Sequence, residues 1–163
     1  HHSVPMAIAL ENLWDAENGA KKHKSRDGGK KDKNAVQVRV LYGNGNILKA
    51  TAKFDVFSQW RDLVNIGGVE SAIFEQAAEI WGQHPAPVVD AIAPWTVAFC
   101  SRREALKNDQ EKQQQDFQKK LQAFIAGLYQ TTETKQQLAE IQNWLKLAAF
   151  VLRNRDIKIG GNS

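Results

Sequence analysis

The sequence predicts a mostly helical α+β fold: one antiparallel β-hairpin followed by a bundle of about five helices that ends in an antiparallel helix pair. Two observations carry this prediction. Residues 35–54 alternate apolar and polar side chains on either side of a Gly-Asn-Gly-Asn turn, which is typical of a hairpin. From residue 55 onward, apolar residues instead recur every three or four positions, as the buried face of a helix requires.

Length and composition predict one globular domain over residues 35–155. The chain has 163 residues, of which 42% are hydrophobic and 25% charged, as is ordinary for a protein with a buried core. His1-His2 is typical of the remnant of a purification tag, so residues 1–5 are set aside and Met6 is taken as the natural start. A single cysteine and the lack of a signal-peptide pattern favour a cytoplasmic protein.

Residues 6–20 are predicted to form a short N-terminal helix, because four large apolar residues fall at helical spacing and Asn18-Gly19 provides a stop. The next segment, residues 21–34, contains no apolar residue and is predicted to be a mobile basic loop. It has seven basic and two acidic residues, whereas the rest of the chain has 15 basic and 16 acidic residues. The positive charge of the protein therefore belongs to this one segment.

The hairpin register can be tested on the apolar residues. A two-residue turn at Asn44-Gly45 would place apolar and polar residues on the same face of the sheet. A three-residue turn or a bulge avoids this, because Val36, Val38 and Val40 then pair with members of the set Leu48, Ala50, Ala52 and Phe54. The opposite face then carries three cations and no acidic residue among Gln37, Arg39, Lys49, Thr51 and Lys53.

Helices are predicted next over residues 55–64 and 69–81, separated by Gly67-Gly68. The stretch 87–100 is the densest apolar window and is predicted to lie at the centre of the core, divided by Pro94 into two short helices. Cys100, within this stretch, is interpreted as a small buried hydrophobe and not as a nucleophile.

The polar residues 107–116 are interpreted as an exposed helix that leads into the last helix pair. Thr134 and Gln137 form a capping box for the final helix. The apolar stripes of the pair are Phe117, Leu121, Phe124 and Leu128, and Leu138, Ile141, Leu145, Ala148 and Leu152. Residues 156–163 are predicted to be a tail, in which 156–159 could add an edge strand.

The motifs of common enzymes are missing from the sequence, which favours a non-enzymatic protein without a cofactor. His23 and His84 have no metal-ligand spacing, and the glycine pairs lack the Lys-Ser/Thr that follows a phosphate-binding loop. Glu75 and Glu79 lie one helical turn apart, but this arrangement is typical of a solvated helix face.

Binding of DNA or RNA is the function that the charge pattern favours, since lysines and arginines in a flexible arm can contact phosphates. The predicted site combines this arm with the basic hairpin face and an aromatic residue at the hairpin tip: Lys21, Lys22, Lys24, Arg26, Lys30, Lys31, Lys33, Arg39, Tyr42, Lys49 and Lys53. The alternative is a helical protein-interaction or assembly subunit of a larger complex, which would use the apolar seam of residues 117–128. No membrane association is predicted.

Overall fold

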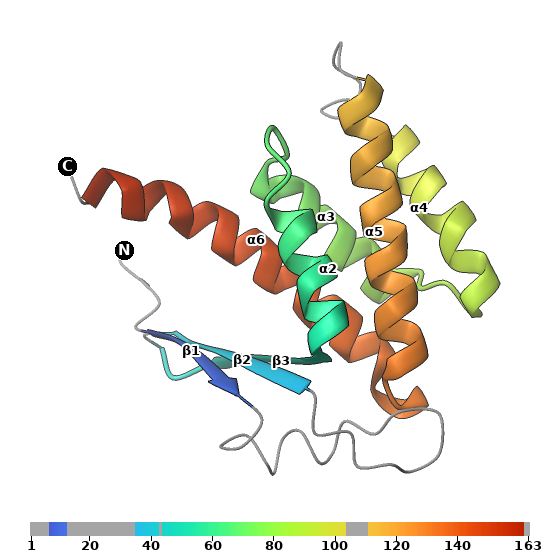
Figure 1. Cartoon of the computed structure of the whole chain (residues 1–163). Helices are drawn as coiled ribbons and strands as arrows, with labels where there is room; N and C mark the ends of the chain where they lie inside the picture. The colour runs from blue at the N-terminus through green and yellow to red at the C-terminus, as the bar shows by residue number, and fades with distance from the viewer. Residues whose placement is uncertain (1–6, 13–34, 43, 104–110, 162–163) are drawn as a thin grey trace.

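The computed structural model describes residues 7–12, 35–42, 44–103 and 111–161 (Figure 1). An antiparallel sheet in the order β1-β2-β3 lies on one side, and the helices gather on the other. The strands are β1 (Ala7–Asn12), β2 (Ala35–Leu41) and β3 (Ile47–Lys53). The helices are α2 (Phe54–Val64), α3 (Ser71–Gln83), α4 (Ile92–Ser101), α5 (Glu111–Thr131) and α6 (Gln137–Gly161), with 3-10 turns η1 (Val89–Ala91) and η3 (Thr134–Gln136). The predicted mostly helical α+β fold is confirmed.

The hairpin has the predicted three-residue turn. Val36, Val38 and Val40 pair with Ala52, Ala50 and Leu48, and the three valines are buried beneath the helices. The Tyr42 N–H donates to the Asn46 carbonyl at 2.9 Å, which leaves three residues between them in the chain. Gly45 has a φ of 89°, in the region that a side chain disfavours, so the position of this glycine suits the turn.

The N-terminal helix predicted over residues 6–20 is wrong for the part that the structure describes. Residues 7–12 form β1, which pairs antiparallel with β2 from Ala7↔Leu41 to Asn12↔Val36. Alternation of Ile8 and Leu10 with smaller or polar residues fits a strand as well as the helical spacing fits a helix, and pairing with β2 favours the strand. The remainder of the predicted helix and the basic loop lie outside the described residues.

The core lies between the sheet and the helices, and its centre is an aromatic cluster. The rings of Trp60 and Trp144 meet edge-on with centroids 5.2 Å apart, and Phe57 and Phe124 pack against Trp144. Trp60 Nε1 donates to the Trp144 carbonyl at 3.0 Å, so the ring nitrogen is satisfied inside the core. This cluster ties α2 and α5 to α6.

The prediction that residues 87–100 lie at the centre of the core is wrong. Only one face of this segment is buried, through Ile92, Thr96, Phe99 and Cys100. Val88 is 56% and Val97 47% exposed. Apolar density did not predict burial because α4 lies at the margin of the helical layer, beside α5 (Figure 1).

The last two helices follow the predicted stripes, with two corrections. Phe117, Leu121, Phe124 and Leu128 of α5 are fully buried, as are Ile141, Leu145 and Ala148 of α6. Leu138, however, is 45% exposed, because it stands at the first turn of α6. The predicted tail or edge strand at 156–159 is also wrong, since α6 continues to Gly161. After leaving α5, α6 makes its most extensive contacts with α3.

The polar segment 107–116 is helical where the structure describes it. Glu111 begins α5, and the predicted helix is therefore present from that residue onward, whereas residues 104–110 lie outside the described part. Among the described residues, no helix is long and apolar enough to cross a membrane.

Candidate nucleic-acid interface

The face of the sheet turned away from the helices is built from side chains at alternate positions of β2 and β3. Four cross-strand pairs follow one another from the hairpin turn to the far end of the strands. They are Leu41↔Ile47, Arg39↔Lys49, Gln37↔Thr51 and Ala35↔Lys53. We call this set the outer face. All five described helices lie on the opposite side of the sheet (Figure 1). The outer face carries the three hairpin cations that the sequence predicts, with Lys53 separated from Arg39 and Lys49 by the Gln37–Thr51 pair.

Arg39 and Lys49 stand directly opposite each other, which places two positive charges side by side on the outer face. Lys49 is exposed and Arg39 partly buried. The Arg39 Nε donates to Gln37 Oε1 at 2.7 Å along the same strand, and this bond orients the guanidinium. Two cationic side chains at directly opposite positions of an antiparallel pair form a compact positively charged spot on the surface of the sheet.

The next pair toward the far end is polar but buried. Gln37 Nε2 donates to Thr51 Oγ1 at 3.1 Å, and the two residues are only 5% and 6% exposed. A continuous set of hydrogen bonds therefore runs from Arg39 through Gln37 to Thr51. Because each buried polar group has a partner, this network can hold Arg39 in a fixed position.

The network continues into α6, which covers the outer edge of β3. The backbone N–H of Thr51 donates to Glu140 Oε1 at 2.5 Å, and the Thr51 carbonyl accepts from Trp144 Nε1 at 3.0 Å. Both groups of Thr51 that point away from β2 are thus satisfied by the helix, as a fourth strand would satisfy them. This edge of the sheet is closed at Thr51.

Glu140 is the residue of this region that sequence reasoning missed. Burial raises the pKa of its carboxyl group to about 7, and the hydrogen bond from the Thr51 N–H opposes the shift. A glutamate in an amphipathic helix is ordinarily a surface residue, and no local pattern distinguishes this one. Its contact with β3 joins residues 89 positions apart in the chain.

An apolar pair borders the two cations at the hairpin end of the outer face. Leu41 is 37% and Ile47 52% exposed, and they face each other across the strands. Tyr42, which the sequence predicts to stack on a base, is half-buried and packs edge-on against Phe150 of α6, with ring centroids 6.0 Å apart. The apolar contribution to this end of the face therefore comes from aliphatic side chains.

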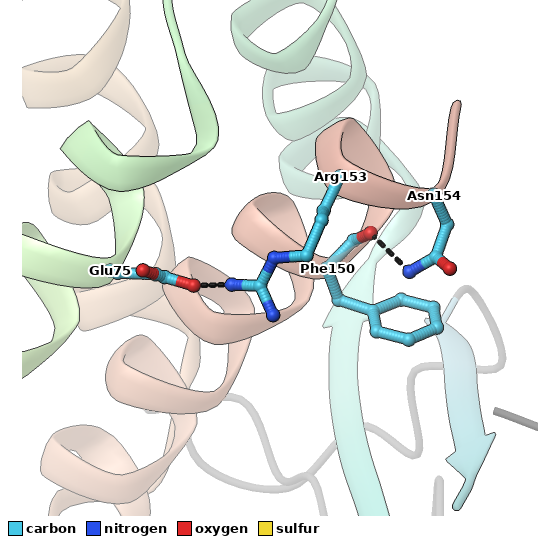
Figure 2. A network of polar contacts seen from close by, with 4 residues as sticks. All are labelled: Glu75, Phe150, Arg153 and Asn154. Carbon is cyan, nitrogen blue, oxygen red and sulfur yellow. Dashed lines mark hydrogen bonds and ion pairs between the residues drawn. The ribbon is translucent and has the colours of Figure 1, made fainter. Parts of the chain in front are cut away.

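Two polar contacts lie close to Phe150 on α6, one to α3 and one within α6 itself (Figure 2). Arg153 forms an ion pair with Glu75 of α3, and Asn154 Nδ2 donates to the Phe150 carbonyl at 2.8 Å. Both partners of the ion pair are about half exposed, so the pair orients α6 on α3 more than it stabilises the fold. Glu75 thus has a structural partner, whereas Glu79 is an exposed residue of α3.

β1 adds one acidic residue to the outer face by register. Glu11 stands opposite Gln37, on the same face of the sheet as Ala7 and Ala9. The two hairpin strands themselves carry no acidic residue on this face, as the sequence predicts. Arg39 pairs with Ala9 in this register.

The arm residues of the predicted site, Lys21, Lys22, Lys24, Arg26, Lys30, Lys31 and Lys33, lie outside the described residues. One attachment point is nevertheless defined, because residue 34 at the end of the arm directly precedes Ala35 at the start of β2. Ala35 pairs with Lys53. The C-terminal end of the arm is thus joined to the strand position that pairs with Lys53.

Other candidate sites in the described residues offer less chemistry. No group of three or more metal-ligating side chains occurs among the described residues. Burial raises the pKa of Cys100 to about 12, so the thiol is protonated at neutral pH. An open groove of about 810 Å³ lies between α2 and α5, lined by acids, amides and lysines, of which Asp116 and Lys120 pair with each other at 3.2 Å.

Comparisons with protein-family models, curated proteins and solved structures found no match for this chain. The fold and the outer face therefore carry the functional argument by themselves.

Proposed function

We propose that the protein binds nucleic acid through the outer face of the sheet, with the basic arm of residues 21–34 supplying further contacts to phosphates. One observation carries this proposal: the exposed Lys49 lies directly across the strands from the partly buried Arg39, at the end of the outer face where Leu41 and Ile47 are also exposed. A phosphate bound between these two side chains would contact both positive charges.

Two further features support the same surface. The bond from Arg39 Nε to Gln37 keeps the guanidinium in place before a ligand arrives, which lowers the entropy lost on binding. The exposed side chains of Leu41 and Ile47 can contact sugars and base faces beside the phosphate backbone. Neither feature reads base identity, so the proposal is for binding with little sequence preference.

The sharpest test reverses the charge of one lysine. Lys49→Glu places a carboxylate opposite Arg39, which favours folding by roughly 0.2–1 kcal/mol relative to the like-charge pair. The same change removes a phosphate contact and adds repulsion, so the affinity for a short duplex or single strand falls. Fluorescence anisotropy and chemical denaturation measure the two effects. A variant that folds at least as well yet binds more weakly assigns Lys49 to binding.

The matched control is Lys119→Glu, which makes the same change in net charge at an exposed position of α5. We expect this variant to bind almost as the wild type does. If Lys119→Glu and Lys49→Glu weaken binding equally, attraction depends on overall charge and the outer face is not the site. If the wild type binds neither DNA nor RNA at low salt, the proposal fails.

A protein-interaction role is the second candidate, and its surface differs from the one that the sequence suggested. Phe117, Leu121, Phe124 and Leu128 are buried within this chain, so the seam is already occupied. The observation that favours a partner is instead the exposure of Val88 and Val97 near and on α4. Replacing both valines by serine should abolish capture of such a partner and leave nucleic-acid binding unchanged.

A further inference from the structure

The two edges of the sheet differ in which groups bond to their outward backbone N–H and carbonyl groups. At the β3 edge, Glu140 and Trp144 of α6 satisfy the outward backbone groups of Thr51. At the other edge, β1 pairs with β2 alone, and no described segment pairs with its second side. An edge strand whose backbone groups lack partners is a template for another strand.

The pairing pattern identifies which residues of β1 point to this second side. The backbone N–H of Tyr42 donates to Asn46, on the β3 side of the hairpin. The backbone N–H and carbonyl of Thr51 bond to α6, so they point away from β2. Because backbone directions alternate along antiparallel strands, its partner Gln37 bonds toward β1. Glu11 therefore bonds back to Gln37, and the same alternation directs the backbone groups of Ile8, Leu10 and Asn12 outward.

The sequence of β1 lacks three of the features that block pairing at an edge, namely lysine, proline and a bulge, and Glu11 is its one charged residue. The strand reads Ala-Ile-Ala-Leu-Glu-Asn, without lysine or proline, and is paired with β2 at each of its six positions without a bulge. Its register places Ile8 and Leu10 opposite the core residues Val40 and Val38. A partner strand would extend both the backbone ladder and the apolar face.

We propose that two copies of this chain associate by antiparallel pairing of their β1 strands about a two-fold axis at Ala9, which forms a continuous six-stranded sheet. In this register Ile8 pairs with Leu10 of the other copy through the outward backbone groups, and the reverse pair is identical. Ala9 meets its own copy in the close, non-hydrogen-bonded position, where a small side chain fits. Ala7 meets Glu11, so no like charges are opposed.

A second copy fits this edge better than an unrelated strand because the pattern is self-complementary. Moving the two-fold axis to Leu10 would place the apolar Ile8 opposite the polar Asn12. A register shift of one residue would turn the apolar residues of one strand to the opposite face of the sheet. The two-fold axis at Ala9 stands perpendicular to the sheet, so both helical layers lie on one side. The two outer faces then join, with their Arg39 residues three strand spacings, or about 14 Å, apart.

The strand is short, so the dimer is of the reversible kind and its population depends on concentration. Sedimentation of the full chain over a range of concentrations should show a monomer-dimer equilibrium. Ala9→Glu places two carboxylates at the axis, while within one chain it faces Arg39 and leaves folding intact. We expect its dimer dissociation constant to rise about tenfold or more, and Ala9→Gln to remain close to the wild type.

Mixing two variants with opposite charges at Ala9 should restore dimer formation, a result that a folding defect cannot produce. Ala9→Lys alone should remain monomeric, but an equimolar mixture with Ala9→Glu should form the heterodimer. Cysteine provides an independent check of the register: Ala9→Cys should form an intermolecular disulfide under mild oxidation, because its Cα atoms are close enough to bridge. Ala7→Cys should not, since Ala7 faces Glu11 of the other copy, and the buried Cys100 does not compete.

Three results would overturn the proposal. One is a wild-type protein that sediments as a monomer at every concentration. Another is an Ala9→Glu variant that dimerises as the wild type does, which would move the interface elsewhere. The third is disulfide formation by Ala7→Cys as fast as by Ala9→Cys, which would exclude this register. None of these measurements involves nucleic acid, so the dimer and the proposed function can fail independently.

Discussion

Glu140 on α6 accepts the backbone N–H of Thr51 on β3 at 2.5 Å, and this bond joins the last helix to the edge of the sheet. Trp144, one helical turn after Glu140, donates its Nε1–H to the carbonyl of the same threonine. The carboxyl group of Glu140 is therefore buried where α6 meets the sheet. Its protonation state should affect stability.

The first prediction is that Glu140 makes the protein less stable as the pH rises. Its folded-state pKa of about 7 lies above the ordinary value of 4.5, so the folded form keeps a proton that the unfolded chain has lost. The contribution to stability is complete below about pH 4.5 and is lost as the pH rises through 7. Denaturation with urea at several pH values measures this trend.

Glu140→Gln isolates the contribution of this one group. The glutamine carbonyl can still accept the Thr51 N–H but does not ionise, so the variant should be more stable than the wild type at pH 8 and similar at pH 5. Glu133→Gln, at an exposed position before α6, is the control and should follow the wild-type profile. Identical pH profiles for wild type and Glu140→Gln would show that the pKa of Glu140 is the same in the folded and unfolded states.

The second prediction compares two leucines of α6 that the sequence places in the same stripe. Leu145 is fully buried, so Leu145→Ala should lower the free energy of unfolding by roughly 2–5 kcal/mol. Leu138 is 45% exposed, and Leu138→Ala should cost less than about 0.5 kcal/mol. Equal losses for the two variants in chemical denaturation would contradict the placement of α6.

The sequence predicted well those elements of the fold that depend only on the local pattern of apolar and polar residues. Large apolar side chains at helical spacing identified α2, α3, α5 and most of α6, since only one face of each helix can be buried. The hairpin register followed from matching Val36, Val38 and Val40 with apolar partners. These predictions need only the geometry of one element or of two adjacent strands.

The errors occurred where distant contacts decide the structure. Ile8 and Leu10 suit a helix and a strand alike, and only pairing with β2 makes residues 7–12 a strand. Apolar density at Val88 and Val97 did not show which side of the fold α4 would occupy. In the candidate site, the outer-face cations followed from alternation, but Glu140 and the packing of Tyr42 on Phe150 depend on where α6 crosses the sheet.

The third prediction uses proline to locate the start of α5. Gln118 lies in the helix interior, so Gln118→Pro removes a backbone hydrogen bond and should cost about 3 kcal/mol. Gln114 lies only three residues after Glu111, and a helix can begin slightly later at little cost, so Gln114→Pro should cost clearly less. A Gln114→Pro variant as unstable as Gln118→Pro would mean that the helix extends well before Glu111.

The last prediction concerns the basic arm and rests on the distribution of charge. Residues 21–34 hold seven of the 22 basic residues, whereas the rest of the chain is close to neutral. If the arm contacts phosphates, each contact contributes about 0.9 to the slope of log K against log salt on duplex DNA. Replacing Lys21, Lys22, Lys24, Lys30, Lys31 and Lys33 by glutamine should therefore flatten this slope.

The stability of the six-lysine variant separates binding from folding, because surface charges of this kind contribute little to the folded state. Its unfolding midpoint should match that of the wild type, while Lys49→Glu in the same background should weaken binding further if the outer face is the docking surface. An unchanged salt slope would show that the arm makes no phosphate contacts. A flattened slope without any further effect of Lys49→Glu would assign binding to the arm alone, and the outer face would then have no part in it.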